Sequence, residues 1–348
     1  QSYFVGLLAE QARLTENAAP ADLKLLTEKL TYLTDEQIKL ITSAHAYASR
    51  AHDGQWRRTG HEYISHPTAV ASILADMRMD HQTLMAALLH DVIEDSSTSK
   101  SSLGDQFGRP VAEIVDGVSK LTKIFSSRAE AQAENFQKMA LAMAKDIRVI
   151  MVKMADRLHN MRTIGVMSPT QRKRIARETL DFYAPIANRL GIHSMKTELE
   201  ELGFKALYPL RANRIERAVK AARGHRTELM EEITSTITAA LNRDSINGTV
   251  HAREKLTYSI YRKMKTQHKP FAEIMDVFGF RIVVDQVDAC YRTLGMVHNL
   301  FKPVAGRFKD YIAIPKANGY QSLHTSLFGM HGVPIEVQIR TKQMEAMA

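Results

Sequence analysis

The sequence predicts an α+β protein of two domains, an all-helical domain followed by a mixed α/β domain. The chain of 348 residues is long enough to form two hydrophobic cores. From about residue 35 to residue 243, apolar side chains recur at helical spacing, and no β-hairpin is expected there. After the turn dipeptide Asn247-Gly248, apolar and polar side chains alternate with period two. We place the domains at 1–196 and 197–348, with the boundary inside an interval, Lys196 to Asn213, that the pattern leaves open.

Helix start signals support the all-helical domain. Thr34 followed by Gln37 is a capping-box pattern, which predicts a helix start at about residue 35. Pro67 suits the first turn of a second helix. Apolar side chains at four-residue spacing after Leu84 predict a third helix that contains residues 88–95. Further helices are expected at 111–121, 136–143, 147–164 and 170–190.

A mixed sheet is predicted for the second domain. Residues 278–285 are rich in β-branched and aromatic side chains, as strands are. Residues 322–328 and 334–340 predict the two arms of a hairpin. In the second arm Glu336 and Gln338 share a polar face, which a half-buried strand requires. Helices are expected before the first of these strands, at 256–266, and between the first and the second, at 287–300.

The composition excludes several classes of protein. The apolar runs are far shorter than a membrane span and no signal-peptide pattern opens the chain, so we expect a cytoplasmic protein without a membrane partner. The single cysteine, Cys290, excludes an intramolecular disulfide. The net charge of +9 favours an anionic partner, either nucleic acid or a phosphorylated small molecule. Basic residues concentrate at 211–226 and 253–269, but no nucleic-acid recognition motif accompanies them, so we expect phosphate-rich ligands.

Four ionisable side chains stand among aliphatic ones in the stretch LLHDVIED, residues 88–95. Burial of such groups is costly unless they are paired or bind a metal. Downstream, MADRLHNMRT places Asp156, His159 and Asn160 on one face of a predicted helix. A lone buried histidine is usually an ordinary core residue, but a spaced set of imidazoles and carboxylates suits a divalent ion such as Mn²⁺, Fe²⁺ or Zn²⁺. The candidate metal ligands are His66, His90, Asp91 and Asp156.

Four segments together resemble one known family. They are HDGQWRRTGHEYISHP, LLHDVIEDS, DGVSKLTKI and KMADRLHNMRT. Their His…His-Asp…Asp pattern is similar to that of the HD superfamily of all-helical, metal-dependent phosphohydrolases. More closely, the segments resemble the hydrolase domain of the RelA/SpoT homologues, the enzymes that control the alarmone (p)ppGpp. The resemblance covers residues 44–189 and implies loss of pyrophosphate from the 3′ position, which returns GDP or GTP.

The resemblance also assigns roles to residues of this chain. It implies that His66, His90, Asp91 and Asp156 bind the metal, which in the family is usually Mn²⁺. Glu94 and Asp95 would orient and deprotonate the attacking water, a role that suits carboxylates beside a metal. The residues implied in nucleotide binding are Arg57, Arg58, Asn160 and Thr163.

A second group of polar residues lies in the C-terminal half. Asp276 precedes one predicted strand and Glu336 lies on another, so two carboxylates could hold Mg²⁺ while neighbouring cations neutralise a triphosphate. These segments resemble the (p)ppGpp synthetase domain of the same family, a nucleotidyltransferase-like fold that transfers pyrophosphate from ATP to GDP or GTP. The resemblance implies that Asp276 and Glu336 are its catalytic acids and that Tyr320 stacks on guanine. The other candidate substrate-binding residues are Arg253, Lys255, Ser259, Lys263, Arg307, Lys309, Lys316, Asn318 and His324.

This sequence departs from the family in the synthetase-like half. Ala252 and Leu256 stand where the family has Gly and His, which restricts a phosphate-approaching loop and removes a hydrogen-bond donor. The chain ends soon after QIRT, so we expect a truncated domain without the C-terminal regulatory modules of the family. The leading hypothesis is therefore a (p)ppGpp hydrolase with a weak, inactive or regulatory synthetase-like half. The alternatives are a bifunctional enzyme and, in another class, a nucleotide-sensing or nucleic-acid-binding module without catalysis.

Overall fold

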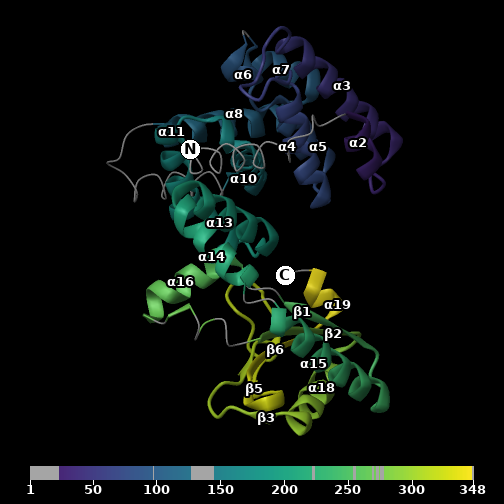
Figure 1. Ribbon diagram of the computed structural model, residues 1–348. Helices are drawn as coiled ribbons and strands as arrows, with labels where there is room; N and C mark the ends of the chain where they lie inside the picture. The colour runs from purple at the N-terminus through teal and green to yellow at the C-terminus, as the bar shows by residue number, and fades with distance from the viewer. Residues whose placement is uncertain are drawn as a thin grey trace. The chain divides into compact units, whose positions relative to one another are not determined.

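The computed structural model describes residues 23–346, except 97, 127–144, 222–223, 254–255, 269, 272–273 and 275–277. The chain divides into two compact units, with the division between Ile175 and Ala176 (Figure 1). The described part of the first unit is helical, and the second contains a mixed sheet with helices, so the predicted fold class is confirmed. The division lies earlier in the chain than residue 196, and the predicted domain boundary stays a prediction.

The first unit is built from helices of 4 to 18 residues. The predicted capping box is confirmed, since the Thr34 hydroxyl accepts the N–H of Gln37 and the Gln37 side chain accepts the N–H of Thr34. The helix predicted at 136–143 lies outside the described residues. The helices are α2 (Leu23–Lys29), α3 (Asp35–Ala51), α4 (Ser65–Asp76), α5 (His81–Leu89), α6 (Val92–Asp95), α7 (Lys100–Phe107), α8 (Arg109–Ser126), α10 (Ile147–Arg162), the 3₁₀ turn η1 (Ile164–Val166) and α11 (Pro169–Glu178), which crosses the division.

Helix α5 forms the centre of the first unit. Every side chain from Thr83 to Leu89 is buried, because α5 packs against α3, α4, α8 and α10. Its C-terminal end therefore delivers His90 to the interior.

The prediction that residues 88–95 form part of one buried helix is wrong. The helix ends at Leu89, and α6 begins after Asp91, whose carbonyl oxygen accepts the N–H groups of Glu94 and Asp95 at 3.0 and 2.9 Å. Glu94 and Asp95 are exposed, so only the first part of the stretch is an interior site. The turn separates the charged residues into an interior pair and an exposed pair.

One short hairpin lies inside the region from about residue 35 to residue 243, where no β-hairpin was expected. A bridge pairs Trp56 with Glu62, and the Arg57 N–H donates to the carbonyl of His61 at 2.9 Å. We call residues 55–63 the arginine hairpin. It is too short to produce a clear period-two pattern, yet it positions Arg57 next to the candidate site.

The second unit combines helices with a six-stranded sheet. The helical elements are the π turn η2 (Thr179–Tyr183), α12 (Ala184–Arg189), α13 (His193–Leu207), α14 (Pro209–Ala221), α15 (Gly224–Arg243), α16 (Thr257–Gln267), α18 (Val287–Leu300), the 3₁₀ turn η3 (Met330–Gly332) and α19 (Lys342–Ala346). The strands are β1 (Gly248–Arg253), β2 (Phe278–Val284), β3 (Lys302–Pro303), β4 (Lys309–Asp310), β5 (Leu323–Phe328) and β6 (Pro334–Thr341).

The sheet has the strand order β1-β2-β6-β5-β3, with β4 also paired to β5. Strands β5 and β6 pair antiparallel through η3, which confirms the predicted hairpin, and β2 runs parallel to β6. Strand β1, which pairs antiparallel with β2, was not predicted.

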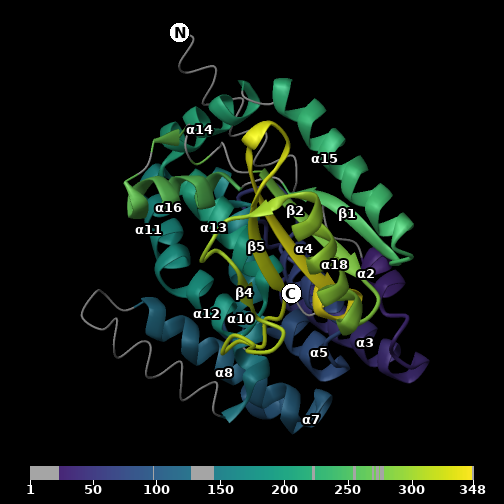
Figure 2. The same cartoon turned by 90° about the horizontal axis from the view of Figure 1, so that it is seen from below.

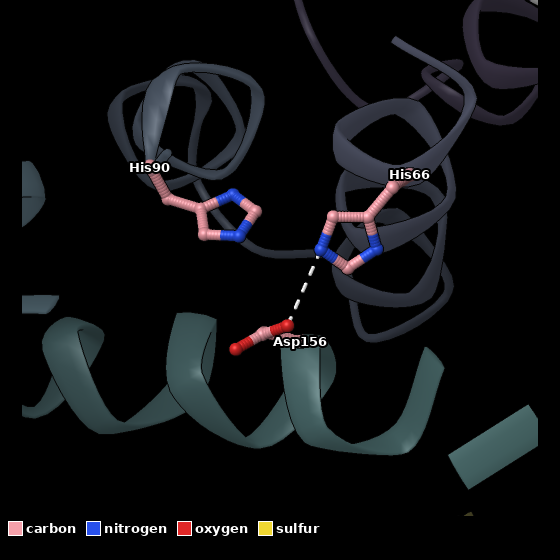
Figure 3. Close-up of side chains that lie close together, drawn as sticks. All are labelled: His66, His90 and Asp156. Atoms are coloured by element: carbon pink, nitrogen blue, oxygen red, sulfur yellow. Dashed lines mark ion pairs between the residues drawn. The ribbon is translucent and has the colours of Figure 1, made fainter. Parts of the chain in front are cut away.

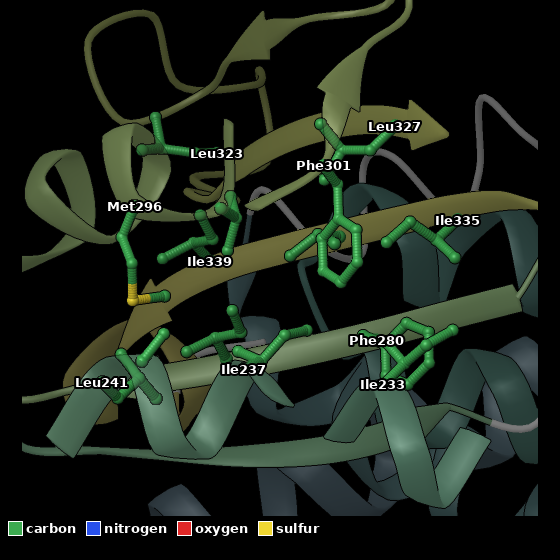
Figure 4. Close-up of a cluster of buried hydrophobic side chains, with 14 of the residues drawn as sticks. Ile233, Ile237, Leu241, Phe280, Met296, Phe301, Leu323, Leu327, Ile335 and Ile339 are labelled. Carbon is green, nitrogen blue, oxygen red and sulfur yellow. The ribbon is translucent and has the colours of Figure 1, made fainter. Parts of the chain in front are cut away.

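One face of the sheet carries the hydrophobic core of this unit (Figure 4). Ile335, Val337 and Ile339 of β6 point to this face, where α15 and α18 cover them (Figure 2). Gln338 and Arg340 alternate with them and are buried on the other face, where they line a pocket. None of the helices in the described part of the chain is long and apolar enough to cross a membrane.

Candidate functional site

Three helices bring His66, His90 and Asp156 together inside the first unit (Figure 3). His66 lies in the first turn of α4, His90 follows α5, and Asp156 lies in the middle of α10. Their ligand atoms all lie within 4.8 Å of one another. The three residues are almost completely buried, with 2, 2 and 5% of their surface exposed. Two imidazoles and a carboxylate that converge in this way form a candidate site for a divalent cation.

Asp91 lies beside this trio and contacts both histidines. Its Oδ1 is 3.2 Å from Nε2 of His90, and its Oδ2 is 3.7 Å from Nε2 of His66. His66 Nε2 is also 3.3 Å from Oδ1 of Asp156. The four residues predicted as metal ligands are thus neighbours, although Asp91 lies at the edge of the group.

The chemistry of these side chains fits a cation. The Nε2 atom of His90 is buried and has no hydrogen-bond partner within the described ranges. Its Nδ1 lies 2.8 Å from the carbonyl oxygen of Ala87 and must donate the proton, so the lone pair of a neutral His90 is on Nε2, toward the site. A buried nitrogen lone pair with no donor is costly unless a cation binds it.

His66 is oriented by a second histidine. Its Nδ1 lies 2.7 Å from Nδ1 of His159, so one of the two atoms carries the proton. If His66 binds a metal through Nε2, its Nδ1–H donates to His159. Burial lowers the pKa of His66, and it lowers the pKa of His159 to about 2, with His66 and Arg57 contributing, so both imidazoles are neutral at pH 7.

The carboxylate of Asp156 is held ionised by its neighbours. Lys153 donates to its Oδ2 at 2.7 Å, and Asn160 donates to its Oδ1 at 2.5 Å. Burial by itself raises the pKa of Asp156, but Lys153 and the hydrogen bond with His66 hold it well below the ordinary value. Burial likewise opposes ionisation of Asp91, whose pKa His90 and His66 nevertheless lower. Both carboxylates are therefore available as anionic ligands.

The predicted nucleotide-binding residues have different surroundings. Arg57 donates to Oδ1 of Asn160 at 3.2 Å, which connects it to Asp156 through one side chain. Arg58 instead donates to Gln171 at 3.1 Å. Thr163 is buried, and its hydroxyl donates to the carbonyl of His159 at 3.1 Å. Arg57 and Asn160 therefore border the metal cluster. The Thr163 hydroxyl instead makes a hydrogen bond to the backbone in the last turn of α10.

Tyr63, His159 and Lys153 are site residues to which the sequence assigned no role. Tyr63 donates to Oδ2 of Asp91 at 2.8 Å, and burial, followed by Asp91 and Asp95, raises the pKa of its phenol. The spacing of Lys153 and His159, three residues before and after Asp156 on α10, was a usable signal. Tyr63 gave none, because its partner lies 28 residues away.

Some synthetase-like candidates gather in two pockets of the second unit. Ser259, Lys263 and Glu336 line a cavity of about 50 Å³ together with Leu256. A larger pocket, about 850 Å³, has Tyr320 and a group of polar side chains in its wall. These include Lys316, His324, Arg262, Arg281 and Arg340.

The ring of Tyr320 is enclosed by polar groups. It stacks on His193 with centroids 5.4 Å apart, its hydroxyl lies 2.9 Å from Nε2 of His324, and Lys316 Nζ is 4.8 Å from its centroid. Asn318 donates to the carbonyl of Asn188 at 3.0 Å and borders a neighbouring pocket.

The remaining candidates are not brought into these pockets. Arg307 and Lys309 are exposed and line neither pocket. Asp276 and Lys255 lie outside the described residues, as does the side chain of Arg253.

Comparison with known proteins agrees with this arrangement. Residues 44–193 match the HD domain family model, and residues 252–348 match the model of a region found in RelA and SpoT proteins. The chain belongs to the RelA/SpoT family. The HD domain of this family and the His/Asp cluster together imply a divalent metal.

Members of the family with curated names are similar over most of this chain. Guanosine-3′,5′-bis(diphosphate) 3′-pyrophosphohydrolase of Vibrio cholerae is 59% identical over 91% of the chain and 45% of its own length. The bifunctional (p)ppGpp synthase/hydrolase SpoT of Escherichia coli is 58% identical, with the same coverage. GTP pyrophosphokinase of Myxococcus xanthus is 46% identical over 91% of the chain and 42% of its own length. The chain thus spans less than half the length of these relatives.

Proposed function

We propose that this chain carries a Mn²⁺-dependent hydrolase that removes the 3′-pyrophosphate of (p)ppGpp and yields GDP or GTP plus pyrophosphate. The observation that carries the proposal is the buried cluster of His66, His90 and Asp156, with Asp91 beside it. Within the described residues, the buried Nε2 atom of His90 has no hydrogen-bond partner. The names of the relatives from Vibrio cholerae and Escherichia coli supply the substrate class. Mixed imidazole and carboxylate ligands suit a divalent ion such as Mn²⁺, Fe²⁺ or Zn²⁺, and the family resemblance favours Mn²⁺ among these.

The residues around the cluster divide the chemistry between them. When bound, a divalent cation supplies Lewis-acid polarisation of phosphate oxygens and of water. His66, His90, Asp91 and Asp156 would hold it. A water molecule attacks the phosphorus next to the 3′ oxygen, the bond between them breaks, and the 3′ oxygen leaves with a proton. Glu94 and Asp95 follow Asp91 by about one turn and are exposed, so they can accept the proton of the attacking water.

Arg57 is proposed to bind the phosphates of the substrate. Its guanidinium lies over the ring of Tyr63 at 5.9 Å and reaches Asn160 beside the cluster. A fork of N–H donors matches phosphate geometry.

The Arg57→Ala variant should raise KM for ppGpp. A lost charge-assisted hydrogen bond of about 1.5–3 kcal/mol corresponds to a roughly 10- to 100-fold increase. Arg109, whose side chain is 91% exposed and 4.0 Å from Glu113, offers a matched control, since Arg109→Ala removes the same charge away from the site. Steady-state kinetics of both variants check this, and an unchanged KM in Arg57→Ala would remove this residue from the substrate site.

The proposal is tested by product analysis. Purified protein incubated with ppGpp and Mn²⁺ is expected to release GDP and intact pyrophosphate in equal amounts. Release of single phosphates would indicate a different phosphohydrolase. Nucleic-acid affinity that falls steeply with salt, without any hydrolysis, would favour the binding-module alternative.

A bifunctional enzyme is the second candidate, and the pocket around Tyr320 favours it. The pocket, about 850 Å³, is large enough for a nucleotide and is rich in cations. Against it, Leu256 contributes an apolar side chain to the small cavity that holds Ser259, Lys263 and Glu336. We therefore propose that synthesis is weak or absent and that a nucleotide bound in this unit regulates the hydrolase.

An assay of pyrophosphate transfer from ATP to GDP distinguishes the two candidates. Little or no ppGpp should form, measured in the Glu94→Gln background, where hydrolysis is expected to be slow enough for product to accumulate. Ala252 lies in strand β1 and not in a loop, so the expected restriction of a loop at this position is wrong. A combined Ala252→Gly and Leu256→His variant is expected to raise the rate, because Leu256→His restores a hydrogen-bond donor at the small cavity. Rapid transfer by the unmodified chain would support the bifunctional reading.

A further inference from the structure

Tyr63 is the side chain that joins the arginine hairpin to the metal cluster. It ends the hairpin, where its N–H donates to the carbonyl of Gln55 at 3.0 Å. Its hydroxyl donates to Oδ2 of Asp91 at 2.8 Å. The same residue thus contacts a proposed metal ligand and lies under Arg57, the proposed phosphate-binding residue.

The ring of Tyr63 is held from several sides. It stacks on His52, with centroids 4.5 Å apart and planes at 28°. It meets the edge of His66 at 6.2 Å and 79°. His52 is itself buried, and its Nδ1 lies 3.0 Å from the side-chain oxygen of Gln55. Contacts on both the face and the edge fix where the hydroxyl lies.

The hydroxyl engages one oxygen of Asp91 and leaves the other without a hydrogen bond from Tyr63. Oδ2 accepts from Tyr63 and lies 3.7 Å from Nε2 of His66, whereas Oδ1 lies closer to the cluster, 3.2 Å from Nε2 of His90. Without this hydrogen bond the carboxylate could rotate about its Cβ–Cγ bond, since the side chain is 21% exposed. Hydrogen bonds to ligating carboxylates orient them toward a metal.

We propose that Tyr63 is a positioning residue that holds Asp91 with Oδ1 directed to the metal. The inference rests on the proposed metal site. Tyr63 acts through the metal ligand Asp91 and does not contact the substrate. The same ring lies beneath Arg57. One side chain therefore fixes the positions of both Asp91, the proposed metal ligand, and Arg57, the proposed phosphate-binding residue.

The test is Mn²⁺ binding by the Tyr63→Phe variant, which removes one oxygen and keeps the ring. The dissociation constant, followed by calorimetry and by the electron paramagnetic resonance signal of free Mn²⁺, should rise roughly 10- to 100-fold. Tyr32→Phe is the matched control, because the Tyr32 hydroxyl also makes a 2.8 Å hydrogen bond, to the carbonyl of Met79, away from the cluster. Hydrolysis by Tyr63→Phe should recover at saturating Mn²⁺, a rescue that a folding defect would not give.

A double-mutant cycle shows whether Tyr63 acts through Asp91. In an Asp91→Ala background, Tyr63→Phe should leave the remaining Mn²⁺ affinity unchanged. An equal loss of affinity in both backgrounds, or no loss in the single variant, overturns the inference. Absence of Mn²⁺ binding by the unmodified chain would instead refute the proposed metal site, so the two failures are distinguishable.

Discussion

The Asp156→Ala variant is expected to lose both Mn²⁺ binding and hydrolysis of ppGpp. Asp156 contributes the carboxylate of the three-residue cluster and contacts His66 at 3.3 Å. It also accepts from Asn160, which accepts from Arg57, so the substitution disturbs the proposed phosphate-binding group as well. Calorimetry with Mn²⁺ and measurement of pyrophosphate release check the two losses separately. Retention of stoichiometric Mn²⁺ binding would show that Asp156 is not a ligand.

The same variant should also lower the free energy of unfolding. Lys153 is buried and lies 2.7 Å from Oδ2 of Asp156, and removal of one partner of a buried ion pair typically costs about 3–5 kcal/mol. Combining Asp156→Ala with Lys153→Met removes both charges and should restore much of the stability, but not the activity. Urea unfolding followed by circular dichroism measures this. Activity that returns with stability would mean that Asp156 has only a structural role.

The Glu94→Gln variant should bind Mn²⁺ normally and turn over about 100- to 10,000-fold more slowly, the range typical for loss of a general base. Glutamine keeps the shape of the side chain but cannot accept a proton. Glu94 is exposed and lies outside the His66–His90–Asp156 cluster, so metal affinity should not change.

Comparison variants sharpen this prediction. Asp95→Asn tests whether the second carboxylate accepts the proton. Asp95 also interacts with Tyr63, which contacts Asp91. Glu36→Gln, in the exposed first turn of α3, removes a carboxylate far along the chain from the site and should leave turnover unchanged. Full turnover by both Glu94→Gln and Asp95→Asn would exclude this pair as the proton acceptor.

The helices and strands predicted from the sequence were those in which apolar side chains recur at a regular spacing along the chain. Strands β2, β5 and β6 were predicted because β-branched and aromatic side chains alternate or cluster in them. Strand β1, GTVHAR, was not predicted, because it lies at the edge of the sheet and offers few apolar residues to alternate. Its position depends on pairing with β2, about 30 residues later, and such pairing leaves little local signal.

The candidate site was predicted in part for the same reason. His66, His90, Asp91 and Asp156 were predicted as metal ligands from motif spacing, and they are neighbours, although their role in metal binding stays a prediction. The break after Leu89 could not be seen, because apolar spacing continues across it to Val92. Tyr63 was missed because a hydroxyl finds its partner through tertiary packing, and nothing in the local pattern of the sequence marks it.

Hydrolysis of ppGpp in water labelled with heavy oxygen tests the central claim most directly. The metal-free protein is assayed with and without added Mn²⁺, and the heavy-oxygen content of GDP and of pyrophosphate is measured by mass spectrometry. We predict that hydrolysis depends on Mn²⁺, that GDP and pyrophosphate form in equal amounts, and that one solvent oxygen enters pyrophosphate while none enters GDP. Metal-independent turnover, release of orthophosphate, or solvent oxygen in GDP would contradict it.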